Sequence, residues 1–168
     1  FYAGSHRKTK IVASGNVAPY NAAQSESGMN KDKIKNSLRS FAEQHLDISR
    51  AGRFKHHFAL YECPKCEAHS LRAVVERHKG DKPKDFEGIL WTDCPRCQCE
   101  QMALGITQKG KKATPPERVD RPACSCGNDT FYMGSLDQWE KPATFVKGTV
   151  VAMCTICDNI LPLVDTDG

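Results

Sequence analysis

Nine cysteines, eight of them in four close pairs, constrain the fold of this 168-residue chain more than any other feature. Three pairs enclose two residues, in "CPKC", "CPRC" and "CTIC", and the fourth encloses one, in "CSC". Disulfides require an oxidising compartment, for which the sequence gives no evidence, whereas metal ligation places cysteines in close pairs. We therefore interpret the four pairs as metal half-sites.

The pairs form an internal repeat. The spacing from Cys66 to Cys94 equals the spacing from Cys126 to Cys154, so a constant offset in residue number relates the two copies. A strand-like run leads into the second pair of each copy, "ILWTD" in one and "TVV" in the other. The predicted metal ligands are therefore Cys63, Cys66, Cys94 and Cys97 in one site and Cys124, Cys126, Cys154 and Cys157 in the other.

Four thiolates suit zinc, which they hold tetrahedrally at about 2.3 Å in closed structural sites. A unit of about 45 residues around one such site has little hydrophobic core, so metal binding supplies much of its folding free energy. We expect two Zn²⁺ ions, one per unit. Iron is an alternative, as are disulfides or free thiols.

The four pairs resemble the tandem zinc ribbons of the rubredoxin-like superfamily, over about residues 56 to 166. Paired ribbons of this type occur in small RNA polymerase subunits, in transcript-cleavage factors and in accessory subunits of larger enzymes. The resemblance implies a small, metal-stabilised, mostly β fold with two tandem ribbons. Catalytic transcription ribbons carry an acidic hairpin motif, "ADE" or similar, and its absence from both copies argues against transcript cleavage.

Rubredoxins also use two cysteine pairs, and glycine usually follows their knuckles. Here the residues after the second cysteine of each pair are Glu67, Gln98, Gly127 and Asp158. This difference favours zinc over iron.

The rest of the chain is predicted to flank and connect the two ribbons. Residues 1–28 are expected to form an extended or disordered arm, and residues 29–53 a helical segment. Ribbon 1 is expected over residues 54–106 and ribbon 2 over residues 123–168. The Pro- and Lys-rich residues 107–122 between them read as a stiff, exposed linker.

The helix is predicted from apolar residues at helical spacing. Asn30 can cap its start, Asp32 suits its first turn, and Gly52 is the expected stop. We expect its stripe either to pack on ribbon 1 or to dock on another protein. The stripe consists of Ile34, Leu38, Phe41 and His45 or Leu46.

Charge differs between the two ends of the chain. Residues 1–123 carry 22 Lys and Arg against 14 Asp and Glu, whereas residues 124–168 carry 2 against 6. Two zinc ions on eight thiolates would bring the formal charge of +4 close to neutral. The basic end predicts a nucleic-acid contact, with a solvated face or an acidic protein partner as the alternative. Its candidate residues are Arg50, Arg53, Lys55, His56, Lys109, Lys111 and Lys112.

Ribbon 2 contains the apolar run "DTFYMGSLDQWE". A unit this small is not expected to bury Phe131, Tyr132, Met133, Leu136 and Trp139 together, and exposed aromatic residues favour protein interfaces. We therefore expect ribbon 2 to face a protein partner.

The ninth cysteine, Cys99, and the histidines are not needed as ligands. Cys99 is expected to be a small buried residue beside its knuckle, with a spare ligand or a redox-sensitive thiol as the alternative. His56, His57, His69 and His78 are expected to be surface or strand residues.

We expect no enzymatic activity, because the sequence has no Gly-rich phosphate loop, His-Glu-x-x-His motif or paired-carboxylate signature. The expected function is a non-catalytic two-zinc adaptor or accessory subunit of a larger assembly, located in the cytoplasm. The alternatives are a structural zinc subunit of a metabolic enzyme complex and a rubredoxin-like electron carrier. No membrane association is expected, since no apolar run approaches about 18 residues.

Overall fold

The structure, a computed structural model, describes residues 30–49, 51–79, 86–105, 118–141 and 143–167. The expected N-terminal arm and most of the expected linker lie outside these ranges. Within them, one helix, α1 (Lys31–His45), precedes eight strands. The strands are β1 (Phe54–Leu60), β2 (Ser70–Lys79), β3 (Phe86–Asp93), β4 (Glu100–Gly105), β5 (Arg118–Asp120), β6 (Thr130–Glu140), β7 (Thr144–Cys154) and β8 (Ile160–Asp167).

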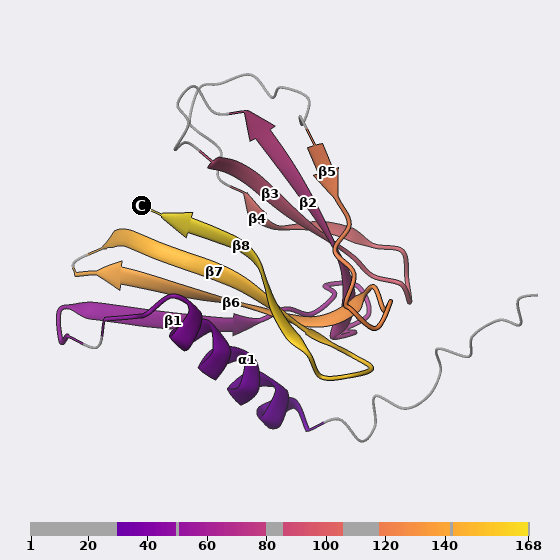
Figure 1. Cartoon of the computed structure of the whole chain (residues 1–168), viewed down its shortest axis with the longest axis horizontal. Coiled ribbons are helices and arrows are strands. Elements are labelled where there is room, and N and C mark those ends of the chain that lie inside the picture. The colour runs from indigo at the N-terminus through magenta and orange to yellow at the C-terminus, as the bar shows by residue number, and fades with distance from the viewer. Residues whose placement is uncertain (1–29, 50, 80–85, 106–117, 142, 168) are drawn as a thin grey trace, which may run out of the picture.

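All eight strands belong to one antiparallel sheet, with the order β4-β3-β2-β6-β7-β8. β2 and β6 pair only between residues 70–72 and 130–132, and beyond these residues they diverge. The sheet therefore opens into two parts, which are separate in Figure 1 and meet where β2 and β6 begin. We call β2, β3, β4 and β5 the first half-sheet, and β6, β7, β8 and β1 the second. The predicted mostly β architecture with one helix is confirmed.

The sequence repeat recurs in the strand register. Val75 lies opposite Leu90 in the first half-sheet, and the equivalent residues Ser135 and Val150 lie opposite each other in the second. The β3–β4 ladder shifts register after Leu90, and the β7–β8 ladder shifts after Val150. Even this irregularity is therefore repeated at equivalent positions.

Two short strands cross between the halves. β1 precedes the first cysteine pair but pairs with β6, and β5 precedes the third pair but pairs with β2. Leu71 lies opposite Phe131 at the centre of the β2–β6 pairing. The two half-sheets are thus related by a pseudo-twofold axis at this residue pair, and each receives a strand from the other repeat.

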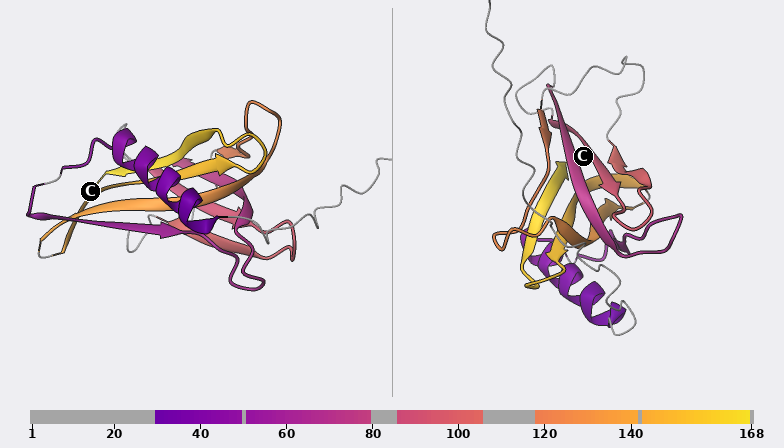
Figure 2. Two further views of the ribbon diagram at one scale, coloured as in Figure 1. Left: turned by 90° about the horizontal axis from the view of Figure 1, so that it is seen from below. Right: turned by 90° about the vertical axis from the view of Figure 1, so that its right-hand side faces the viewer.

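The core lies on both faces of the second half-sheet. Its inner face packs against the first half-sheet through a cluster that includes Leu71, Leu90, Phe131, Met133 and Val150. Its outer face is covered by α1, as the two further views in Figure 2 show. The helix residues in this second cluster are Ile34, Leu38 and Ala42, and the strand residues are Leu136, Val151 and Met153.

The helix was expected on ribbon 1 or on another protein, but α1 packs mainly on β6, β7 and β8 of the second half-sheet. From the residues predicted as ribbon 1, Phe58 and Leu60 of β1 add partly buried side chains to its cluster. Its stripe is occupied within the chain, with Leu38 and Ala42 fully buried. The physical reason is the pairing of β1 with β6, which carries the chain preceding β1 to the second half-sheet.

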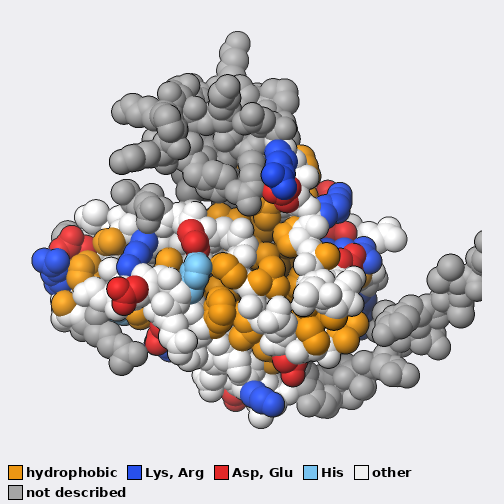
Figure 3. Space-filling model, viewed as in Figure 1, with side chains coloured by type: hydrophobic (Ala, Val, Ile, Leu, Met, Phe, Trp, Pro, Cys, Tyr) orange, Lys and Arg blue, Asp and Glu red, His pale blue; other side chains and the backbone are white. Residues whose placement is uncertain are grey.

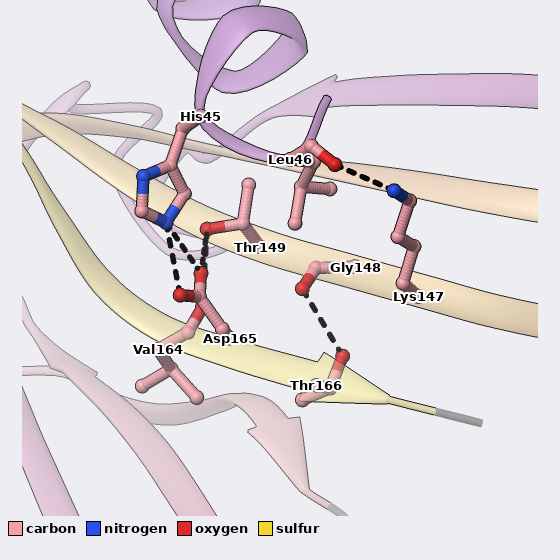
Figure 4. Close-up of polar contacts among 8 residues, drawn as sticks. All are labelled: His45, Leu46, Lys147, Gly148, Thr149, Val164, Asp165 and Thr166. Atoms are coloured by element: carbon pink, nitrogen blue, oxygen red, sulfur yellow. Dashed lines mark hydrogen bonds and ion pairs between the residues drawn. The ribbon is translucent and has the colours of Figure 1, made fainter. Parts of the chain in front are cut away.

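The helix begins as predicted and ends early. The side chain of Asn30 accepts a hydrogen bond from the backbone amide of Lys33 at 3.0 Å, which is the geometry of an N-cap. The helix ends at His45 rather than near Gly52. Figure 4 shows two contacts that hold this end on the sheet. Lys147 Nζ donates to the carbonyl of Leu46 at 2.5 Å, and His45 Nε2 lies 2.9 Å from Asp165 Oδ2.

The expected exposure of the apolar run in β6 was also wrong for most of its residues. Phe131, Met133 and Leu136 are fully buried, whereas Trp139 is 38% exposed. Successive strand residues point to opposite faces, and both faces of β6 are covered, one by the first half-sheet and one by α1. Among the described residues, no helix is long and apolar enough to cross a membrane.

Candidate metal centres

The structure brings the eight paired cysteines into two clusters of four. In the first cluster, Cys63 Sγ lies 3.4 Å from Cys97 Sγ, and Cys66 Sγ lies 3.5 Å from Cys94 Sγ. The second cluster has the same two distances, 3.4 Å between Cys124 and Cys157 and 3.5 Å between Cys126 and Cys154. Within each cluster all four sulfur atoms lie within 4.8 Å of one another.

These distances fit a metal ion held by four sulfur atoms. A tetrahedron with metal–sulfur bonds of about 2.3 Å has edges of about 3.8 Å. This value is slightly above the separations of 3.4 and 3.5 Å and below the 4.8 Å limit within which all four sulfur atoms lie. Both clusters consist only of thiols, the donors that soft and borderline metal ions prefer. Each could therefore hold a metal ion through the four cysteines that the sequence predicted.

The knuckles have a common backbone conformation. The residue after the second cysteine of each pair has a positive φ, 59° at Glu67, 57° at Gln98 and 58° at Asp158. Its amide donates to the carbonyl of the first cysteine, as Glu67 does to Cys63 at 2.8 Å. This left-handed residue reverses the chain, so that both thiols of a pair point to one side.

The one-residue pair keeps this design with a tighter turn. The amide of Gly127 donates to the carbonyl of Cys124 at 2.8 Å, and the amide of Cys124 donates to the carbonyl of Asn128 at 2.8 Å. The φ of Gly127 is 85°, further into the positive region than at the three other knuckles. Glycine adopts such a conformation without a steric penalty, which explains why glycine follows the shortened pair.

Backbone amides favour the thiolate form of one buried cysteine in each cluster, Cys63 and Cys154. Burial raises the pKa of Cys63, but the amides of Lys65 and Cys66, together with the thiols of Cys97 and Cys66, outweigh it and bring the pKa to about 6. In the second cluster, burial is likewise outweighed at Cys154, where the amides of Cys157 and Ile156 bring the pKa to about 6. A metal ion binds the thiolate form, so the lowered pKa values of Cys63 and Cys154 favour the binding of a cation.

The two clusters differ in exposure and in their neighbours. The outer cysteines, Cys66 and Cys97, are half-buried in the first cluster, whereas Cys126 and Cys157 are exposed in the second. Asn128 Nδ2 donates to Cys154 Sγ at 3.3 Å and to Thr155 Oγ1 at 3.1 Å. The second cluster therefore combines greater exposure to water with a side-chain donor to one of its sulfur atoms.

Sequence reasoning missed this asparagine, although a signal was present. An Asn stands two residues after the second cysteine in both "CGN" and "CDN", and Asn159 Nδ2 lies 4.0 Å from Cys124 Sγ. At the equivalent positions of the first copy stand Ala68 and Cys99, which makes Cys99 the counterpart of Asn159. Cys99 is half-buried and packs against the core beside its knuckle.

The predicted basic patch is only partly placed. Arg50, Lys109, Lys111 and Lys112 lie outside the described residues. Lys55 is exposed on β1, whereas the adjacent His56 is half-buried and its Nε2 atom is buried without a hydrogen-bond partner in the described part of the chain. Adjacent strand residues point to opposite faces, so Lys55 and His56 do not form one surface. Arg53 is exposed and lies 3.4 Å from Glu140.

Comparisons with models of known families, with curated proteins and with solved structures found no match to this chain.

Proposed function

We propose that the chain is a non-catalytic, two-zinc adaptor built from tandem zinc ribbons, and an accessory subunit of a larger assembly. The observation that carries this proposal is the all-cysteine composition of both clusters. Catalytic zinc usually keeps an open position and a His or carboxylate ligand, whereas four thiolates form a closed structural site. The zinc ions would hold the four knuckles, each of which connects two successive strands of the sheet.

Two surfaces support the adaptor role. Ile156, between Cys154 and Cys157, is 64% exposed and supports a protein contact at the second cluster, in place of the apolar run that β6 buries. Arg53 and Lys55, at the start of β1, support a contact with nucleic acid. These surfaces lie at opposite ends of the second half-sheet, because Cys154 pairs with Phe131 and Lys55 with Trp139.

Cobalt substitution tests whether the clusters are closed. Four-thiolate cobalt absorbs visible light, and its spectrum changes when an external ligand such as azide enters the coordination sphere. We expect the spectrum of the wild-type protein with two bound Co²⁺ ions to be unchanged by azide. The variant Cys97→Ala, which opens one position in the first cluster, is the positive control and should respond.

An azide response of the wild-type protein would overturn the proposal of two closed structural sites. A protein isolated from its native source with iron and a red colour would instead support the electron carrier. Native mass spectrometry gives the accompanying count, for which we expect two zinc ions per chain.

A further inference from the structure

One end of the second half-sheet carries a row of side chains from three strands. Trp139 of β6 lies in direct register with Lys55 of β1 on one side and with Phe145 of β7 on the other. Residues directly opposite each other in antiparallel strands project from the same face of the sheet. Lys55, Trp139 and Phe145 therefore share one face, although Lys55 and Trp139 are far apart in the sequence. We call these three residues the tip row.

The indole of the tip row is both fixed and accessible. The rings of Trp139 and Phe145 meet edge to face, with 5.2 Å between their centroids and 71° between their planes. Trp139 nevertheless stays 38% exposed, in contrast to the buried Phe131, Met133 and Leu136 of the same strand. An aromatic ring that contacts a neighbouring ring at one edge and is exposed to solvent can stack on a planar ligand.

Three basic residues lie near this indole, and one of them, Lys55, is directly opposite it in the sheet. Lys55 is exposed, and no carboxylate of the described residues forms an ion pair with it. Lys141 follows β6, and its Nζ atom donates to the carbonyl of Gly52 at 2.8 Å. The guanidinium of Arg53 lies 4.9 Å from the ring centre of Phe54 and 3.4 Å from Glu140. Figure 3 shows basic and acidic side chains beside hydrophobic ones at this end of the molecule, left in the view.

The acidic groups at this end do not cancel the positive charge. Glu140 is the only carboxylate among the described residues 51–55 and 139–141, against Arg53, Lys55 and Lys141. Asp137, the next acid along β6, lies directly opposite His57. Burial raises the pKa of Asp137, and the nearby His57 acts in the opposite direction. The tip row thus joins Lys55 of the basic part of the chain to Trp139 and Phe145 of the acidic part, with Arg53 and Lys141 as further basic residues at this end.

We propose that the tip row binds single-stranded nucleic acid, with a base stacked on Trp139 and the backbone phosphates near Lys55 and Arg53. Stacking of a base on an aromatic side chain contributes about 1–3 kcal/mol and tolerates any sequence, while nearby cations follow the phosphates. The bases of a duplex are already stacked on one another, so the indole selects unpaired strands. This inference rests on the nucleic-acid contact of the proposed function and names its site and ligand class.

Tryptophan fluorescence reads out the contact directly. The chain has two tryptophans, so Trp91→Phe leaves Trp139 as the sole indole. We expect a single-stranded dT or U oligonucleotide to quench Trp139 in the zinc-loaded full chain, and a blunt duplex of equal length to quench it little. Trp139→Ala, followed by anisotropy of a labelled strand, should weaken binding about 5- to 150-fold, the equivalent of about 1–3 kcal/mol.

Two further variants separate charge from stacking. Lys55→Gln should reduce the slope of log K against log salt by about 0.7, the value for one phosphate contact with a single strand. Met102→Ala removes another exposed apolar side chain, 53% exposed and located in the first half-sheet, and should leave binding unchanged.

The outcomes distinguish this inference from the broader proposal. Salt-dependent binding of single strands that neither quenches Trp139 nor weakens in Trp139→Ala would overturn the tip row and leave nucleic-acid contact through other basic residues. Equal affinity for the duplex would overturn stacking. No binding to either form would overturn the nucleic-acid contact itself, and the exposed tip would then favour a protein partner.

Discussion

The two half-sheets share one strand register and differ in what covers their outer faces. In the second, Leu136, Val151 and Met153 contact α1. At the equivalent positions of the first repeat, the first half-sheet has Glu76, Trp91 and Asp93. Two of these three are acidic, and no described helix packs over them. A carboxylate is costly to bury, so acidic residues suit a face that no helix covers. The repeated frame is thus maintained by its inner face and its knuckles, while the outer faces have separate roles.

The connection before β5 is shorter than the segment before β1. The segment that contains α1 and leads to β1 covers residues 31–53, whereas only residues 106–117 lie between β4 and β5. A helix with the 15 residues of α1 cannot be accommodated in the second connection. Within the described residues, the pseudo-twofold relation between the half-sheets covers the sheet and not α1.

Metal removal should have the largest effect. On the proposed function each half-sheet is held by a zinc ion in its own cluster, and zinc contributes on the order of 10 kcal/mol to the folding of small zinc domains. We expect Cys94→Ser and Cys154→Ser each to reduce zinc from two ions to one, and a strong chelator to abolish the cooperative thermal transition measured by circular dichroism. An unchanged melting curve after complete metal removal would show that the clusters do not hold the fold.

The outer faces should respond very differently to matched truncations. Leu136→Ala removes a fully buried side chain beneath α1 and should cost about 3 kcal/mol in urea unfolding. Glu76→Ala, at the equivalent position of the first half-sheet, removes a half-buried side chain that no described helix covers, and it should cost less than Leu136→Ala. Equal costs at the two positions would contradict the difference in cover between the half-sheets.

The two clusters should differ in their dependence on a side-chain donor. Asn128→Ala removes the hydrogen bond to Cys154 Sγ and should weaken zinc binding at the second cluster about 10- to 100-fold, as loss of an outer-shell partner does elsewhere. Zinc release to a chromogenic chelator measures this loss. Asn159→Ala is the matched control with a smaller effect, because its amide lies 4.0 Å from Cys124 Sγ. If Asn128→Ala released both ions at the wild-type rate, the two clusters would not differ in their dependence on a side-chain donor.

The smallest effect is expected at Asp137, which has no acidic counterpart in the first half-sheet, since Arg77 stands there. Burial raises the pKa of Asp137 above its usual value, so ionisation of this carboxyl destabilises the folded state. The associated stability is present below the unfolded pKa and is lost as pH rises through the folded pKa. Asp137→Asn should therefore melt slightly higher than wild type at pH 7 and equally at pH 3. A variant that melts lower at pH 7 would show that the charge of Asp137 is stabilising.

Local sequence patterns predicted the parts of the fold that depend on short-range geometry. The cysteine spacing predicted which four thiols approach one another, because a knuckle is formed by consecutive residues. Asn30 and the stripe of Ile34 and Leu38 predicted the helix for the same reason. The glycine after the one-residue pair was explained by the tight turn that it must adopt.

The contacts that were missed depend on long-range pairing. Nothing near β1 in the sequence indicates that it pairs with β6, yet this pairing places α1 on the second half-sheet and covers the apolar run of β6. It also places Lys55 beside Trp139. The sequence alone showed the basic segment around Lys55, but it did not show that Trp139 lies next to it. The sheet order, rather than any single motif, assembles the tip row.

An anomalous difference map from crystals of the full chain, collected at the zinc absorption edge, tests the central claim most directly. We expect two peaks per chain, each about 2.3 Å from four sulfur atoms, one among Cys63, Cys66, Cys94 and Cys97 and the other among Cys124, Cys126, Cys154 and Cys157. A map with no peak at either cluster, or with a zinc ion bound by fewer than four of these sulfurs and by an external ligand, would contradict it.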